Sequence, residues 1–298
     1  MYFFFLWASR IVPLLPRCFL RLLPDILGPL AWLFAGRARR QATINARHVL
    51  GPEIQDTAAG RRRLRRVVRG MFRNSMSNYL EAFLTPALSC QEILHRVYAA
   101  HEEYLEEALA LGKGVILFSA HFGPFEYMSQ WLAAKGYQVI IPVESLKDER
   151  MLRLMLELRS SQGVRFVPLG GSGPMRTIMQ TLRKNQIVLI AADRAVEGES
   201  VIKHFFGTPA RLPIGPVNLS IRTGAPLVGA LGWHSSRRRI SGEYIRSSLA
   251  LSEQERQQPD VVEGALIREF ERIIRAHPEQ WVVFSPIWEE HAVPVTLL

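Results

Sequence analysis

The sequence is poor in cysteine and in acidic residues. Only two cysteines, Cys18 and Cys90, occur among 298 residues, so the chain has neither a disulfide framework nor cysteines at metal-site spacing. Such scarcity is typical of a protein in a reducing, cytoplasmic setting. Lysine and arginine number 37 against 27 aspartate and glutamate, and the net charge of +10 predicts an anionic partner: nucleic acid, an anionic membrane or an acidic substrate.

Several functional signatures are also missing. Basic and aromatic residues do not alternate along a predicted strand, as they do in an RNA-binding sheet, and the glycines fit neither a dinucleotide fingerprint nor a P-loop. We therefore expect no cofactor, no metal and no nucleic acid partner. The length of 298 residues and the hydrophobic content of 48% suit one α/β domain with a sizeable core, although two domains also fit the length.

Residues 1–36 are apolar but are interrupted too often for a membrane-spanning helix, which needs about 18 uncharged apolar residues in a row. The interruptions are Arg10, Arg17, Arg21, Asp25, Pro13, Pro16 and Pro24. A signal peptide fits poorly, because no basic start precedes the apolar residues. We expect helices that lie in the membrane interface with their arginines directed to the headgroups; a helical hairpin packed on the core is the alternative.

Residues 37–73 are rich in arginine. Within 61–73, apolar residues recur at helical spacing between the arginines, at Leu64, Val67, Val68, Met71 and Phe72. A basic amphipathic helix beside an apolar segment predicts a surface patch for anionic lipid. A nucleic-acid patch and a solvated basic face are the alternatives. Residues 74–110 are expected to continue as helices, with a break at Pro86.

From residue 112 onwards, strands alternate with helices, which predicts an α/β fold with a mostly parallel central sheet flanked by helices. Strands are expected near 114–120, 138–143, 165–169, 187–192, 201–205, 226–233 and 239–248, with 281–284 as a candidate late strand. Helices are expected near 124–135, 148–162, 174–184, 214–223 and 260–276. We predict one domain, 1–298, with a helical, membrane-associating part over 1–111 and an α/β core over 112–298.

A histidine and a carboxylate follow the first predicted strand of this core. The apolar run ends at His121, Gly123-Pro124 breaks it, and Glu126 falls in the first turn of the next helix, where negative charge is favoured. Both lie at the carboxyl edge of the sheet, where open α/β sheets bind ligands. We expect His121 to take the proton of a substrate hydroxyl, Glu126 to bond its other ring nitrogen, and nearby backbone N–H groups to hold the oxyanion; structural roles for both residues are the alternative.

The segment from His121 to Glu126, after an apolar strand, resembles the His-x4-Asp/Glu motif of the lysophospholipid acyltransferase superfamily. Four downstream blocks resemble its branch of lipid A late acyltransferases and phosphatidylinositol mannoside acyltransferases. These blocks are residues 143–147, 158–163, 192–194 and 205–216. The resemblance covers roughly residues 1–290 and is specific as a set of motifs.

The resemblance implies a fold similar to that of glycerol-3-phosphate acyltransferases, in which charged side chains shape the pocket around the histidine. Those side chains are Glu144, Arg159, Asp193 and Arg194. Arg211 is the preferred candidate for a phosphate or headgroup contact. Without the resemblance, a Glu144–Arg159 salt bridge, an Asp193 turn cap and a solvated Arg211 remain open.

The resemblance further implies an O-acyltransferase that moves a fatty acyl chain from an acyl thioester, acyl-CoA or acyl carrier protein, to a hydroxyl of a glycolipid or phospholipid acceptor. Residues 191–198 replace the Phe-Pro-Glu-Gly-Thr-Arg block of glycerolipid acyltransferases, which favours a larger, glycosylated acceptor. We expect a peripheral or monotopic protein on the cytoplasmic face of the cell (inner) membrane. The alternatives are a non-catalytic, lipid-binding protein of the membrane surface and a nucleic-acid-binding protein.

Overall fold

The computed structural model describes residues 2–51, 54, 57–144, 148–170, 173–195, 199–236 and 239–288. A seven-stranded sheet has the order β1-β9-β8-β2-β5-β3-β4, and every neighbouring pair is parallel except β8 with β9. Its strands are β1 (Val97–Ala100), β2 (Val115–Ser119), β3 (Val139–Val143), β4 (Arg165–Pro168), β5 (Ile187–Ala191), β8 (Leu227–His234) and β9 (Ile240–Ile245). The predicted α/β class with a mostly parallel sheet is confirmed.

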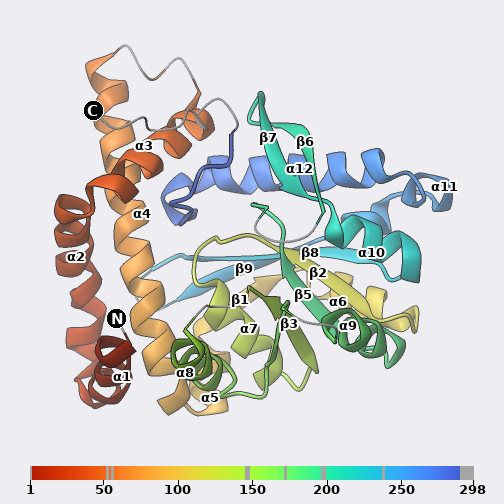
Figure 1. The fold of residues 1–298 in the computed structure, drawn as a ribbon, viewed down its shortest axis with the longest axis horizontal. Helices are drawn as coiled ribbons and strands as arrows, with labels where there is room; N and C mark the ends of the chain where they lie inside the picture. Colours follow the sequence, from red (N-terminus) through yellow and green to blue (C-terminus); the bar gives the residue numbers. More distant parts are fainter. Residues whose placement is uncertain are drawn as a thin grey trace.

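The central strand β2 shows why the sheet carries helices on both faces. All five of its residues are buried. Ile116 and Phe118 pack into one core cluster, and the intervening Leu117 packs into the other, because successive side chains of a strand point to opposite faces. The first cluster is covered by α10 (Gly215–Thr223) and α12 (Pro259–Ala276), and the second by α6 (Glu103–Ala110) and α7 (Phe125–Ala134) (Figure 1).

Helices α8 (Glu149–Arg159) and α9 (Pro174–Arg183) connect the strands β3, β4 and β5, as the predicted alternation of strands and helices requires. Helix α5 (Cys90–Arg96) precedes β1, and the short α11 (Glu253–Arg256) precedes α12. The five helices predicted after residue 112 all occur, with bounds within three residues of the expected ones, because each has a long amphipathic pattern between breakers.

The amino-terminal helices form a layer at one side of the sheet (Figure 1). They are α1 (Tyr2–Ile11), α2 (Arg17–Phe34), α3 (Gly36–Leu50) and α4 (Ala58–Leu84). Thr57 caps α4 by accepting a hydrogen bond from the N–H of Gly60. The predicted amphipathic helix is part of α4: Val68 and Met71 on it are buried, and the neighbouring Arg65, Arg66 and Arg69 are exposed. The break at Pro86 is confirmed by a 3-10 turn at Thr85–Ala87.

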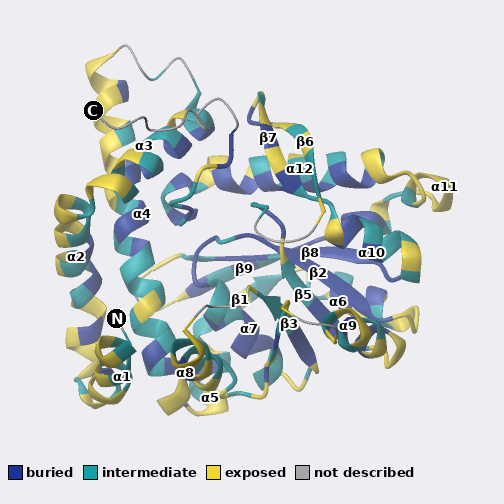
Figure 2. Cartoon of the chain, in the orientation of Figure 1, coloured by how far each residue is buried: buried dark blue, intermediate teal, exposed yellow. Residues whose placement is uncertain are grey.

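Large apolar side chains are exposed along α1, α2 and the turn between them (Figure 2). They are Phe3, Phe4, Trp7, Ile11, Leu14, Phe19, Leu22, Ile26, Leu30, Leu33 and Phe34. Among the described residues, no single helix has the length and apolar character to cross a membrane. The pair α2 and α3, which meet at a bend of 100°, has the length and composition of a broken span.

Two strands fall where the sequence predicts other structure. β1 lies within the stretch expected to be helical, because four residues at a sheet edge are too short for a period-2 signal. As a result, β1 is part of the sheet, α6 packs on one of its faces, and the purely helical layer ends before residue 97. β7 (Thr208–Pro213) lies between the strand expected near 201–205 and the helix expected near 214–223, where no strand is predicted. It pairs with β6 (Ser200–Phe205) in a separate hairpin whose turn residues Phe206 and Gly207 both have positive φ.

Candidate active site

His121 and Asp193 lie side by side at the carboxyl edge of the sheet. β2 and β5 pair in parallel, with Ser119 opposite Ala191, so the residues two positions beyond each strand end meet. Nδ1 of His121 lies 2.8 Å from Oδ1 of Asp193, and the backbone N–H of His121 donates to Oδ2 at 3.0 Å. The indole N–H of Trp281 donates to the same Oδ2 at 2.8 Å. Three donors therefore fix this carboxylate.

The environment of Asp193 keeps its carboxylate ionised. The side chain is fully buried. Burial alone would raise the pKa of Asp193, but the charge of His121 and the hydrogen bonds from His121 and Trp281 outweigh it, so the pKa lies below its usual value. An ionised carboxylate only accepts hydrogen bonds, so Nδ1 of His121 carries the proton. Nε2 is then the ring atom left to accept a proton, and the His121 side chain is 26% exposed.

The turn after His121 is held from several sides. The N–H of Phe122 donates to the carbonyl of Ala120 at 2.7 Å, and the N–H of Gly123 donates to the carbonyl of Gln280 at 2.8 Å. Because the N–H of His121 is also bonded, all three N–H groups of residues 121–123 have acceptors. The expectation that N–H groups of this turn hold an oxyanion is therefore wrong for these three groups; the first turn of α7 is the next source of backbone donors.

Glu126 lies in the first turn of α7, as predicted, but its partner differs from the expected one. It forms an ion pair with Arg159 at the end of α8, and both side chains are mostly buried. The carboxylate on Nδ1 of His121 belongs to Asp193 instead. The physical reason is the strand register, which delivers Asp193 to the histidine from 72 residues away. The alternative of a Glu144–Arg159 bridge is likewise replaced by the Glu126–Arg159 pair.

The tyrosine Tyr79 of α4 lies near this ion pair. Burial raises the pKa of Tyr79, the negative charge of Glu126 adds to the increase, and the positive charge of Arg159 opposes it. Nε of Arg159 is buried without a hydrogen-bond partner in the described part of the chain. The Glu126–Arg159 pair thus links α7 to α8 close to Tyr79 of α4.

The other predicted residues divide into two groups. Glu144 follows β3 and Arg194 follows β5, so both stand at the same sheet edge as His121. Glu144 is exposed and Arg194 is half-buried. Arg211 lies apart on β7, exposed, with its Nη1 3.4 Å from Oγ of Ser200. Residues 145–147, part of one resembling block, and residues 196–198, part of the segment 191–198 that replaces the glycerolipid block, lie outside the described residues.

Trp281 is the site residue that the sequence does not reveal. The candidate strand at 281–284 reduces to an isolated bridge between Phe122 and Trp281. The N–H of Val282 donates to the carbonyl of His121 at 2.9 Å, so this segment straps the histidine turn from the carboxyl-terminal part of the chain. An apolar run near a chain end carries no signal for such a role.

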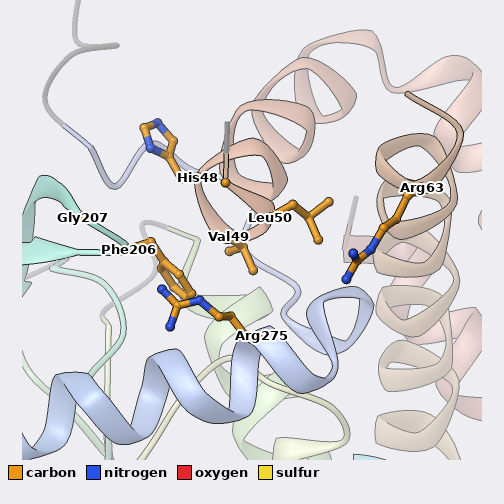
Figure 3. A pocket seen from close by; sticks show the side chains of 8 residues that line it. His48, Val49, Leu50, Arg63, Phe206, Gly207 and Arg275 are labelled. Atoms are coloured by element: carbon orange, nitrogen blue, oxygen red, sulfur yellow. The ribbon is translucent and has the colours of Figure 1, made fainter. Parts of the chain in front are cut away.

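Two cavities lie among the helices around the sheet, and neither His121 nor Asp193 lines them. One, of about 340 Å³, lies between the end of α3, the amino-terminal part of α4, the carboxyl-terminal part of α12 and the β6–β7 turn (Figure 3). The other, of about 430 Å³, lies between α2, α4, α5 and the end of β8. In the part of the chain that the structure describes, no three histidine, cysteine, aspartate or glutamate residues gather to hold a metal ion.

A histidine held by a buried carboxylate at the carboxyl edge of an open α/β sheet is an arrangement that can take a proton from a hydroxyl or water. Residues 1–290 match the family model described as bacterial lipid A biosynthesis acyltransferase. The chain therefore belongs to this acyltransferase family, and the resemblance inferred from its motifs is confirmed.

Curated relatives are phosphatidylinositol mannoside acyltransferases. The protein of Mycobacterium tuberculosis is 29% identical over 213 residues, which are 70% of this chain and 66% of the relative, slightly less than two thirds of its length. The protein of Mycolicibacterium smegmatis is 28% identical over 227 residues, which are 73% of this chain and 72% of the relative. Both the family and these relatives are acyltransferases of lipid A or phosphatidylinositol mannoside type.

Proposed function

We propose that this protein transfers a fatty acyl chain from an acyl thioester to a hydroxyl of a glycolipid at the surface of a membrane. The observation that carries the proposal is the His121–Asp193 pair, because a carboxylate bonded to Nδ1 leaves Nε2 of His121 as the ring atom that can take a proton from a substrate. The family and the activity named for the relatives support an acyl group as the group transferred and a glycolipid as the acceptor. The donor is acyl-CoA or acyl carrier protein.

During the acyl transfer, the imidazole of His121 first takes up a proton and then returns it. Nε2 of His121 removes the proton of the acceptor hydroxyl while the hydroxyl oxygen attacks the thioester carbonyl carbon. The tetrahedral intermediate then expels the thiolate: the C–S bond breaks, and the imidazolium returns the proton to sulfur. The charge of Asp193 stabilises the imidazolium and holds the ring in one orientation.

The Glu126–Arg159 pair serves the site indirectly. His121 packs edge-on against Phe125, whose ring centroid lies 5.5 Å from that of the imidazole. Phe125 precedes Glu126 in the first turn of α7, so an ion pair that fixes this turn to α8 also fixes the ring beneath the histidine. We therefore treat Glu126 and Arg159 as positioning residues.

The membrane surface is part of the proposal. The exposed apolar side chains of α1 and α2 form a face that a bilayer would cover, and arginines lie beside it at Arg10, Arg17 and Arg21. Apolar insertion together with arginine contacts to anionic headgroups binds a helix in the interface. This arrangement supports peripheral or monotopic association with the cytoplasmic face of the cell membrane.

The test is product formation by the purified full-length chain. Labelled long-chain acyl-CoA and, separately, labelled acyl carrier protein are incubated with phosphatidylinositol mannosides, with a lipid A precursor and with lysophosphatidate. We expect acyl transfer to a glycolipid and its loss in His121→Ala. Transfer that survives in His121→Ala contradicts the site, and the absence of transfer with either donor favours a non-catalytic lipid-binding protein.

A further inference from the structure

The cavity in Figure 3 has basic side chains around it, and apolar side chains form its floor. Its charged and ionisable lining residues are His48 of α3, Arg63 of α4 and Arg275 of α12, and the described part of the chain contributes no carboxylate to the lining. Val49 and Phe206 form buried parts of the floor. Two arginines from different helices, with a histidine from a third, favour an anionic ligand with several oxygen atoms, such as a phosphate.

The surrounding contacts hold one of these arginines in place. The Cζ atom of Arg275 lies over the ring of Phe206, 4.9 Å from its centroid. Glu271 accepts a hydrogen bond from the N–H of Phe206 at 2.6 Å, and its other oxygen lies 3.3 Å from Nη1 of Arg275. The guanidinium is therefore oriented by a ring and a carboxylate, and Figure 3 shows it beside the hollow, with Arg63 on the opposite side. A guanidinium that is already oriented loses less freedom when it binds a phosphate.

Aromatic contacts connect this cavity to the catalytic pair. The ring centroid of Phe206 lies 6.5 Å from that of Trp281, and the indole N–H of Trp281 donates to Asp193. A single aromatic side chain thus separates the cavity floor from the carboxylate that holds His121.

The surroundings favour a water-soluble ligand over a lipid headgroup. None of the exposed large apolar side chains of the described residues lies on α3 or α12. The continuous row of exposed large apolar side chains that would suit an acyl chain lies instead along α1 and α2.

We propose that the cavity binds the phosphate groups of the acyl donor's carrier, either the nucleotide phosphates of coenzyme A or the phosphate of a phosphopantetheine arm. Arg63 and Arg275 hold the phosphates and orient the arm so that the thioester reaches His121. This inference rests on the proposed acyl transfer. It adds a second contact that serves donor binding and takes no part in the proton relay.

The test compares two donors that differ in phosphate. Arg63→Gln and Arg275→Gln are assayed with an acyl-CoA and with the corresponding acyl-pantetheine, which has the same thioester but no phosphate. We expect each substitution to raise KM for acyl-CoA about tenfold, because a charge-assisted hydrogen bond is lost, while kcat and the KM for acyl-pantetheine stay unchanged. Both arginines are exposed, so thermal unfolding is expected to remain unchanged and serves as the check on folding.

Matched controls separate local contact from overall charge. Arg62→Gln on α4 and Arg268→Gln on α12 remove the same charge from exposed neighbours outside the lining. The inference is overturned if these controls raise KM for acyl-CoA as much as the two test variants do. It is also overturned if KM rises equally for both donors, or if the test variants lose only their association with phosphatidylglycerol vesicles, which would make a lipid the occupant.

A parallel assay with acylated acyl carrier protein as the donor identifies which carrier the cavity binds. A KM increase with both acyl-CoA and acyl carrier protein assigns the cavity to the shared phosphopantetheine phosphate, and an increase with acyl-CoA alone assigns it to the nucleotide phosphates. Both results support the inference. Wild-type protein that transfers from no donor contradicts the proposed function itself, so the two failures are distinguishable.

Discussion

The carboxylate of Glu126 forms an ion pair with Arg159, on the last turn of α8, although it stands five residues after His121 in the chain. The histidine takes its carboxylate from Asp193 of the neighbouring strand. His121 and Glu126 therefore belong to two different charged pairs. His121 pairs with Asp193 at the reacting ring, and Glu126 pairs with Arg159 beside it.

A double-mutant cycle tests the Glu126–Arg159 pair. Glu126→Gln, Arg159→Gln and the double variant are compared by urea unfolding. Each single change leaves a mostly buried charge without its partner, so we expect a coupling free energy of about 1–3 kcal/mol. A coupling near zero would mean that the two side chains do not interact in solution.

Gly123→Ala tests the backbone of the histidine turn. Gly123 has φ of +52°, and an added Cβ would meet the carbonyl oxygen of Gly232 at 2.1 Å. Gly136→Ala is the matched control, since Gly136 also has positive φ, +95°, but nothing within 4 Å of the added atom. Backbone strain alone costs about 1 kcal/mol, and the collision adds more at Gly123. Equal losses of unfolding free energy in the two variants would contradict the close approach.

Vesicle binding tests the apolar face of α1. Phe4 and Trp7 are 70% and 59% exposed. We expect Phe4→Ser and Trp7→Ser to weaken association with vesicles containing phosphatidylglycerol by about tenfold each, because each removes a large apolar side chain from the interface. Tyr98→Ser, at a 73% exposed aromatic on the edge strand β1, should bind as wild type does. Equal binding by all variants would contradict interfacial contact through α1.

Acid unfolding tests the charge state of Asp193. Its pKa is lowered in the folded protein from the ordinary aspartate value of 3.8, so its stabilising contribution is present above that value and is lost as pH falls through the lowered folded value. Asp193→Asn lacks this contribution. The difference in unfolding free energy between wild type and Asp193→Asn should therefore shrink as the pH falls below the ordinary aspartate value. A difference that stays constant into this acidic range would contradict an ionised Asp193.

Local patterns in the sequence predict most of the sheet but not the pairing at its edge. The apolar run of β2 and the breakers after it place His121 at a strand end, and the same reasoning places Asp193 and Glu144 at strand ends. Which of them touch depends on the strand order β2-β5-β3 and its register, and neither is written in any one segment. The hydrogen bond from Trp281 to Asp193 joins residues 88 positions apart, so it depends on where the carboxyl-terminal segment crosses the histidine turn.

The same local patterns do not predict strands that are short or that contain proline. The four residues of β1 follow α5 directly, and their edge position gives them one partner, β9. β7 contains Pro209 and Pro213, which indicate a turn in the sequence but are tolerated in an edge strand of a two-stranded hairpin. In both cases, pairing with a distant strand decides the structure.

The most direct test of the central claim compares kcat for Asp193→Asn and Glu126→Gln in the acyl transfer assay, at saturating donor and acceptor. The carboxylate bonded to Nδ1 of His121 is that of Asp193, so Asp193→Asn should lower kcat by about a hundredfold or more, while Glu126→Gln should lower it far less. Thermal unfolding of both variants confirms that each is folded at the assay temperature. The opposite order, with Glu126→Gln nearly inactive and folded Asp193→Asn nearly as active as wild type, would contradict the assignment of the His121–Asp193 pair as the general base.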